Sequence, residues 1–255
     1  MENIMSRTLS VHNEHELLLK LEKAGITEVL ATKVITSKDN ELAKKLIRLI
    51  QNGGFDPSTS QKRAREVMGA KNVFGIEEAI KHFGVNPSKQ QTAALAEIPF
   101  TEAELEECKE THVLVAVFPF SILEVRGKMT SKLFYDQTWY NKEAFAKDRG
   151  DVSWQLVRKT PFPNSTSKTW QEQQLFLPRT DETPTARVMV YTIIGHLLAT
   201  GERLFENVYV RCSNVNSNGN RVLVGGFDAL GLDVNDYWGD GRHDLVSVAS
   251  VRKFS

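Results

Sequence analysis

Leucine and isoleucine recur at helical spacing through the first hundred residues, between frequent Gly and Asn stops. Four leucines lie within residues 15–23, and residues 40–51 carry a broad apolar face after the candidate N-cap Asp39. The segment IEEAIKHF is followed by Gly84, at the C′ position that favours glycine. This pattern predicts a small helical domain over residues 1–97.

The pattern changes to buried strands after residue 98. Thr101 and Glu104 have the spacing of a capping box, which predicts one more helix. The segment THVLVAVFPF follows, rich in Val and bounded by Pro119, as expected of a buried strand. Residues 152–160 alternate between apolar and polar side chains, which predicts a second strand.

The last seventy residues combine one long helix with several strands. Residues 185–204 form the strongest predicted helix of this half. Residues 206–213 alternate as a strand, the Asn-rich turn NVNSNGN leads into the strand RVLVGGF, and residues 246–254 form a last strand. We therefore expect an α+β protein, with the helical domain followed by a mixed α/β domain with antiparallel strands over residues 98–255.

The charge of the chain is balanced, with 32 Lys and Arg against 32 Asp and Glu. A dedicated duplex-binding domain usually shows a basic excess, so nucleic acid is not the expected main partner. One DNA-binding alternative stays open, because the predicted helices within residues 39–69 have helix-turn-helix spacing and carry Lys62, Arg63 and Arg65. A solvated helix face also explains these charges.

The two cysteines, Cys108 and Cys212, have no CxxC spacing, which predicts two buried free thiols rather than a disulfide or a zinc site. No apolar run approaches the length of a membrane span, and the N-terminal residues show no signal-peptide core. We therefore expect a soluble, cytoplasmic protein.

Aspartates crowd the C-terminal segment, yet NDYWGDGRHDL does not fit the EF-hand pattern. A looser Ca²⁺ site built from Asp side chains and carbonyl groups is not supported by the spacing, so we expect no cofactor. A metal-dependent hydrolase or nucleic-acid-processing enzyme remains an alternative, and it would use carboxylates such as Asp181, Glu182, Asp228 and Asp244.

The C-terminal segment carries a resemblance to a known family. A strand ENVYVRCS, an Asn-rich turn, a strand NRVLVGGF, the Gly, Asp, Asn and Trp-rich segment GLDVNDYWGDGRHDLVSV and a final ASVRK follow one another. This order is similar to the end of a C-type lectin-like domain, and more narrowly resembles the variable proteins of diversity-generating retroelements. The likeness is specific over residues 205–255. It implies a lectin-like fold for residues 98–255, with displayed loops at about 226–247.

The resemblance implies non-catalytic recognition of a small ligand or a protein by these loops. Trp238 and the valines at 246, 248 and 251 are expected to be scaffold, and the oligomeric state stays open. The candidate binding residues are Asp233, Asn235, Asp236, Tyr237, Asp240, Arg242, His243 and Asp244.

Overall fold

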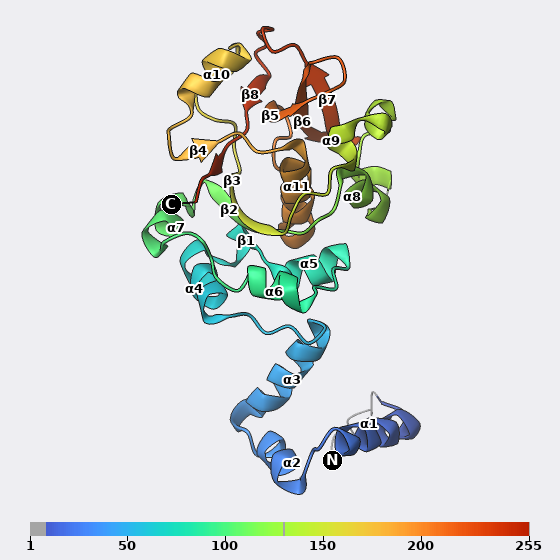
Figure 1. Ribbon diagram of the computed structural model, residues 1–255. Helices are drawn as coiled ribbons and strands as arrows, with labels where there is room; N and C mark the ends of the chain where they lie inside the picture. The colour runs from blue at the N-terminus through green and yellow to red at the C-terminus, as the bar shows by residue number, and fades with distance from the viewer. Residues whose placement is uncertain (1–8, 130, 255) are drawn as a thin grey trace, which may run out of the picture. The chain divides into compact units, whose positions relative to one another are not determined.

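The computed structural model describes residues 9–129 and 131–254 and divides into two compact units, Met1–Gly54 and Phe55–Ser255 (Figure 1). Residues 1–8, on which the expected lack of an export signal partly depends, lie outside the described residues. The division falls at Gly54 and not at residue 97, where the sequence pattern placed it.

The first unit contains three α-helices and one 3₁₀ turn in its described part. These are α1 (Val11–Lys23), α2 (Glu28–Ile35), η1 (Lys38–Asn40) and α3 (Glu41–Gln51). The side chains of Ser10 and Thr27 cap α1 and α2 by accepting backbone N–H groups. Asp39, the expected cap of α3, instead lies inside η1 with a positive φ, and Asn40 is the residue that precedes α3. None of the three α-helices buries a residue.

The second unit holds the remaining elements. Its helices are α4 (Thr59–Met68), η2 (Ala70–Asn72), α5 (Ile76–Phe83), α6 (Lys89–Ala94), α7 (Glu102–Cys108), α8 (Ile122–Lys128), η3 (Ser131–Leu133), η4 (Trp139–Lys142), α9 (Ala144–Lys147), α10 (Trp170–Phe176) and α11 (Ala186–Thr200). Its strands are β1 (Val73–Phe74), β2 (His112–Val117), β3 (Ser153–Arg158), β4 (Asp181–Glu182), β5 (Tyr209–Val215), β6 (Arg221–Asp228), β7 (Gly231–Tyr237), β8 (Val246–Val248) and β9 (Val251–Arg252). Helices and mainly antiparallel strands confirm the α+β class.

The first sheet has the strand order β1-β2-β3-β9-β4, and only β1 and β2 run parallel. Strand β2 lies inside it and buries all six of its residues, as its Val-rich sequence predicts. Strand β1 explains why the second unit begins before residue 97. Its Val73 and Phe74 pair with β2 and are buried, so the helices around them share the core of this sheet.

The second sheet has the order β7-β6-β5-β8, and only β5 and β8 run parallel. Helix α11 contacts strands of both sheets and is buried continuously from Ala186 to His196. An amphipathic helix would leave one face exposed, whereas α11 is buried on all sides over these residues and is therefore a core helix. Gly201, in the left-handed conformation, ends it.

Two elements near the C-terminal segment differ from the sequence-based expectation. The single strand expected over residues 246–254 is divided between the sheets, because β8 pairs with β5 while β9 pairs with β3 and β4. Strand β7, expected as irregular loop, pairs with β6 from Arg221↔Tyr237 to Asp228↔Gly231. The displayed segment therefore consists of one strand followed by one loop, residues 238–245.

Candidate functional site

A buried arginine holds the loop 238–245 from beneath. Arg211 on β5 is fully buried, and its Nη2 donates to the carbonyl oxygens of Trp238 at 3.0 Å and Gly241 at 2.7 Å. Its Nη1 donates to Lys168 O and to Gln173 Oε1, both at 2.9 Å. One side chain thus fixes the backbone of the C-terminal loop and the start of α10 together.

All four acceptors of Arg211 are neutral carbonyl or amide oxygens, and burial lowers the pKa of its guanidinium. An arginine remains protonated even so, so the site contains a buried positive charge whose Nη1 and Nη2 donate to neutral oxygens, while its Nε is buried without a hydrogen-bond partner. The residue was not among the expected site residues. No local signal marks it, because Arg211 occupies a regular polar position in the alternation of the strand ENVYVRCS, as Tyr209 and Ser213 do.

Tyr237 is a half-buried support for the loop. Its ring lies 5.6 Å from the Arg211 guanidinium carbon and 5.8 Å from the ring centroids of both Trp238 and His243. Gly241 lies against the same ring, and a Cβ atom built there would overlap it. Tyr237 therefore presents only part of its surface to a ligand.

Asp233 stabilises the hairpin of β6 and β7 through side-chain hydrogen bonds. It is 9% exposed and accepts hydrogen bonds from Tyr209 Oη at 2.8 Å and Gln137 Nε2 at 2.6 Å. Burial and the neighbouring Asp233 carboxylate raise the pKa of the Tyr209 hydroxyl, so it remains a donor at neutral pH. Asn235 is exposed, and its Nδ2 donates to Asp233 at 3.2 Å.

Asp236 clamps the Asn-rich turn that joins β5 to β6. Its carboxylate accepts from Asn216 Nδ2 at 2.6 Å and from Asn220 Nδ2 at 3.2 Å. Four of the eight expected binding residues lie on β7 and contact neighbouring side chains: Asp233, Asn235, Asp236 and Tyr237.

The remaining candidates gather on the loop after β7. Asp240, Arg242, His243 and Asp244 are exposed. Arg242 Nη2 lies 2.6 Å from Glu172 Oε1 on α10, and His243 Nδ1 lies 3.2 Å from Asp244 Oδ1. The structure thus brings four of the eight predicted residues onto one short exposed segment.

Trp238 differs from its expected scaffold role, because it is 63% exposed and has Leu245, 48% exposed, on the same loop. The valines expected as scaffold, at 246, 248 and 251, are buried. An exposed tryptophan beside charged residues is the typical composition of a binding hot spot.

Helix α10 is joined to this loop. Trp170 N donates to Gly239 O at 2.6 Å, and Ser167 N donates to His243 O at 2.9 Å. A shallow open hollow beside them is lined by Lys168, Glu172, Leu175 and Phe176. Thr169 and Glu172 form the capping box that begins α10.

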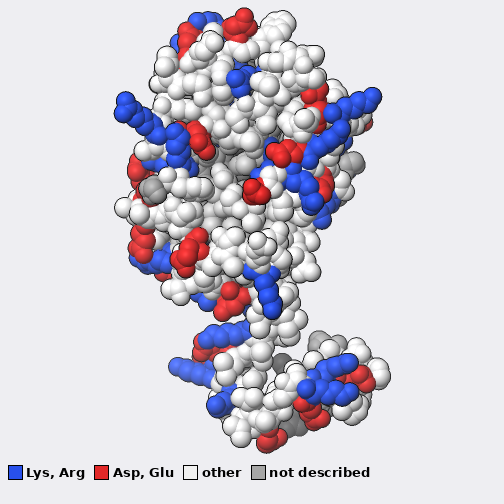
Figure 2. All heavy atoms as spheres, in the orientation of Figure 1, with Lys and Arg blue, Asp and Glu red and all other residues white. Residues whose placement is uncertain are grey.

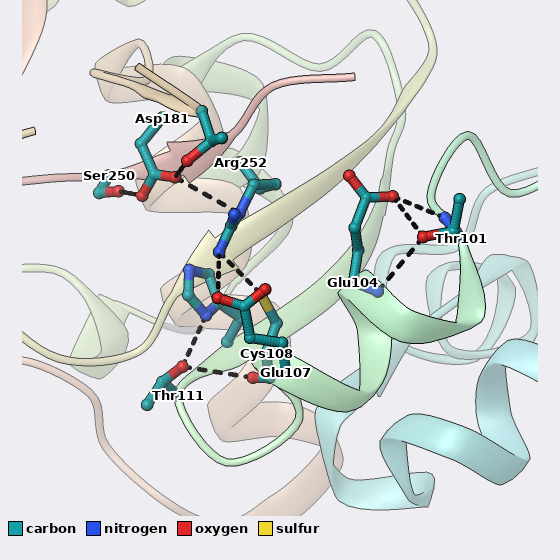
Figure 3. A network of polar contacts seen from close by, with 10 residues as sticks. Thr101, Glu104, Glu107, Cys108, Thr111, Asp181, Ser250 and Arg252 are labelled. Atoms are coloured by element: carbon teal, nitrogen blue, oxygen red, sulfur yellow. Dashed lines mark hydrogen bonds and ion pairs between the residues drawn. The ribbon is translucent and has the colours of Figure 1, made fainter. Parts of the chain in front are cut away.

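The carboxylates of the enzyme alternative are not brought together as a metal site. Asp181 is buried on β4, accepts from Ser250 Oγ at 2.6 Å and lies 3.4 Å from Arg252 Nε (Figure 3). The opposite end of Arg252 reaches Cys108 and Glu107 at the end of α7, each at 3.5 Å. Within residues 9–129 and 131–254, no group of three or more His, Cys, Asp or Glu residues could hold a metal ion.

The basic residues of the DNA-binding alternative are engaged in ion pairs. Arg63 contacts Glu102 at 2.8 Å, and Arg65 contacts Glu78 at 2.8 Å. In Figure 2, Lys and Arg side chains are interspersed with Asp and Glu over the visible face of the second unit. The two helices of the proposed motif, α3 and α4, also belong to different units.

Both cysteines are free and buried, as predicted. Among the described residues, no helix is long and apolar enough to cross a membrane. Comparisons with protein-family models, with curated proteins and with solved structures gave no significant match.

Proposed function

We propose that this protein is a non-catalytic recognition protein that binds a small ligand or a protein through the loop after β7. The recognition surface consists of Asn235, Trp238, Asp240, Arg242, His243, Asp244 and Leu245. We further propose that residues 98–255 of the second unit are a C-type lectin-like domain related to the variable proteins of diversity-generating retroelements.

The proposal rests on one observation: the backbone of this loop is held by the rest of the unit, while several of its side chains are exposed. Most supporting contacts use the backbone of the loop, since Arg211 donates to its carbonyl oxygens, Trp170 N donates to Gly239 O and Ser167 N donates to His243 O. The exception is Arg242, whose guanidinium also reaches Glu172 and Ser167 O. The side chains of Trp238 and Arg242 are left exposed. A loop whose backbone is already ordered loses little conformational entropy on binding, which favours affinity.

The same arrangement agrees with the resemblance to variable proteins. A surface that accepts many different side chains needs a backbone that does not depend on them. Binding energy then comes from a rigid aromatic anchor such as Trp238 and from adaptable polar neighbours. The mixed charges of Asp240, Arg242 and Asp244 favour a partner with both donors and acceptors.

A cytoplasmic location is part of the proposal. Both thiols are buried and unpaired, and a reducing compartment keeps cysteines in this form.

The test is a comparison of variants on arrays of glycans and peptides. The double variant Trp238→Ala, Arg242→Ala removes two exposed side chains from the recognition surface. The control variant Lys81→Ala, Glu97→Ala removes two exposed side chains of α5 and of the segment after α6. We expect signals of the wild type to fall at least ~10-fold in the first variant and to persist in the control.

Thermal unfolding distinguishes lost binding from lost folding. The melting temperature of the first variant should stay within a few degrees of the wild type, because exposed substitutions cost about 0.5 kcal/mol or less. Array signals that survive in the first variant, or a wild type that binds no array member, would contradict the proposal.

A further inference from the structure

Among residues 9–54, which the structure describes, no apolar side chain of the first unit is buried. Thirteen large aliphatic residues among residues 9–54 are exposed, including Leu18 of α1 at 54%, Val29 of α2 at 65% and Ile50 of α3 at 70%. We call the exposed aliphatic side chains of α1, α2 and α3 the N-terminal apolar face. Helices of this length gain most of their stability from packing such a face, so the unit needs a covering surface.

The size of the face matches a protein interface. Together these side chains expose roughly 1,000 Å² of apolar surface, whereas a standard interface buries about 800 Å² per partner. The face is therefore large enough for a stable interface without any other part of the chain.

The charges of the unit favour a second copy of the same chain as the covering surface. Residues 9–54 contain seven Lys and Arg and six Asp and Glu, so the surface does not repel itself. Each helix carries an acidic residue in its first turn and a basic residue in its last, as Glu41 and Arg48 do in α3. When equivalent helices of two copies lie antiparallel, these opposite charges come side by side.

The composition of the face also suits a helical dimer core. Residues 1–54 contain no Phe, Trp or Tyr. Helices that lie in a membrane interface, and hot spots for unrelated partners, are typically rich in aromatic residues. Leucine, isoleucine and valine at helical spacing are the usual residues of helix–helix interfaces between identical chains.

We propose that residues 9–54 are a dimerisation element, in which α1, α2 and α3 of two copies join their N-terminal apolar faces in a two-fold symmetric interface. The inference does not depend on the proposed function of the C-terminal loop.

Light scattering of the full-length chain tests the proposal directly. We expect a particle of twice the 28.8 kDa chain mass at ~0.1 mM, a concentration that detects dimers with micromolar dissociation constants. A monomer at this concentration would overturn the proposal. In that case, slow amide exchange in α3 would assign the face to another segment of the same chain, and co-sedimentation with anionic vesicles would assign it to lipid.

A matched pair of variants locates the interface. Leu46→Ala, Leu49→Ala removes apolar area from α3, and Lys44→Ala, Gln51→Ala changes two residues on the opposite face of the same helix. Alanine preserves helix propensity in both variants. We expect the first variant to weaken dimerisation at least ~10-fold and the control to dimerise like the wild type.

Far-ultraviolet circular dichroism shows whether α3 stays helical, and near-ultraviolet circular dichroism provides the folding control for the second unit, because every Phe, Trp and Tyr of the chain lies after Gly54. The near-ultraviolet spectrum should be the same for both variants and the wild type. A dimer that is insensitive to Leu46→Ala, Leu49→Ala would place the interface elsewhere and overturn the proposal.

Discussion

Gly241 allows the C-terminal loop to close over the Tyr237 ring, because it has no side chain to meet that ring. A Cβ atom at this position would overlap the ring, whereas a Cβ atom on Gly239 would meet only Trp170 Cβ, at 3.8 Å. Neither glycine has a positive φ, so the difference between them is steric. We expect Gly241→Ala to lower the free energy of unfolding by ~1–3 kcal/mol.

The matched variant Gly239→Ala should change the free energy of unfolding by less than about 0.5 kcal/mol. Urea unfolding monitored by tryptophan fluorescence measures both values. Equal stability of the two variants would mean that the loop does not rest on Tyr237 in solution.

His112 gives the second unit a predictable dependence on pH. It is 2% exposed, and its Nδ1 lies 2.8 Å from Thr111 Oγ1. Burial, together with Arg158 on β3 and Arg252 on β9 and against the opposite effect of Asp181 on β4, lowers the pKa of His112 to about 4. The unfolded chain, with a histidine pKa of about 6.5, therefore binds the proton first as the pH falls.

Stability should accordingly be lost between pH 6.5 and the folded-state pKa of about 4. At pH 5, His112 alone accounts for about 2 kcal/mol of this loss. We expect the decrease in unfolding free energy from pH 7 to pH 5 to be smaller by this amount in His112→Leu than in the wild type. The burial-lowered pKa values of His82 and His196 contribute equally to both proteins. An unchanged decrease in His112→Leu would show that this histidine is already protonated in the folded state.

At the scale of elements, the sequence predicts those features that depend on near neighbours. The capping box of Thr101 and Glu104 starts α7, Gly84 ends α5, and the Val-rich segment at residues 112–117 is a buried strand. Each of these signals is complete within a few residues, so no knowledge of distant partners is required.

Strand β7 is an element that near neighbours in the sequence do not predict. Asp233, Asn235 and Asp236 are poor strand formers, and the segment was therefore expected to be loop. Pairing with β6 overrides that preference, and partners distant in sequence, Gln137 and Tyr209, satisfy the buried Asp233 carboxylate. The division of one apolar segment between β8 and β9 depends in the same way on strand partners that no local pattern specifies.

The sequence predicted where the candidate site lies, but not which contacts hold its loop in place. Hydrophilic turn residues identified the exposed Asp240, Arg242 and Asp244. Arg211, which holds the loop, lies about thirty residues earlier in the sequence, and its role depends on carbonyl groups that only the folded chain brings to it. Trp238 was expected to be scaffold because tryptophan is usually well buried, whereas its backbone carbonyl is the part that the core holds.

At the scale of the whole molecule, the helices before residue 97 belong to two different units. Those after Phe55 share a core with the first sheet, as the burial of Met68, Phe74 and Phe83 shows. Those before Gly54 bury no residue. Helical periodicity is the same in both groups of helices, and for this reason the sequence pattern predicted one helical domain over residues 1–97.

This division predicts that the two units unfold separately. All tryptophans lie in the second unit, so tryptophan fluorescence monitors that unit alone, while far-ultraviolet circular dichroism also includes α1, α2 and α3. We expect the dichroism signal to show an earlier thermal transition that the fluorescence lacks. If the N-terminal apolar face joins two copies, a tenfold increase in protein concentration stabilises the dimer by about 1.4 kcal/mol and raises the temperature of the earlier transition alone. A single transition, seen by both signals at one temperature and at every concentration, would show that residues 9–54 are stabilised by the second unit and not by another chain.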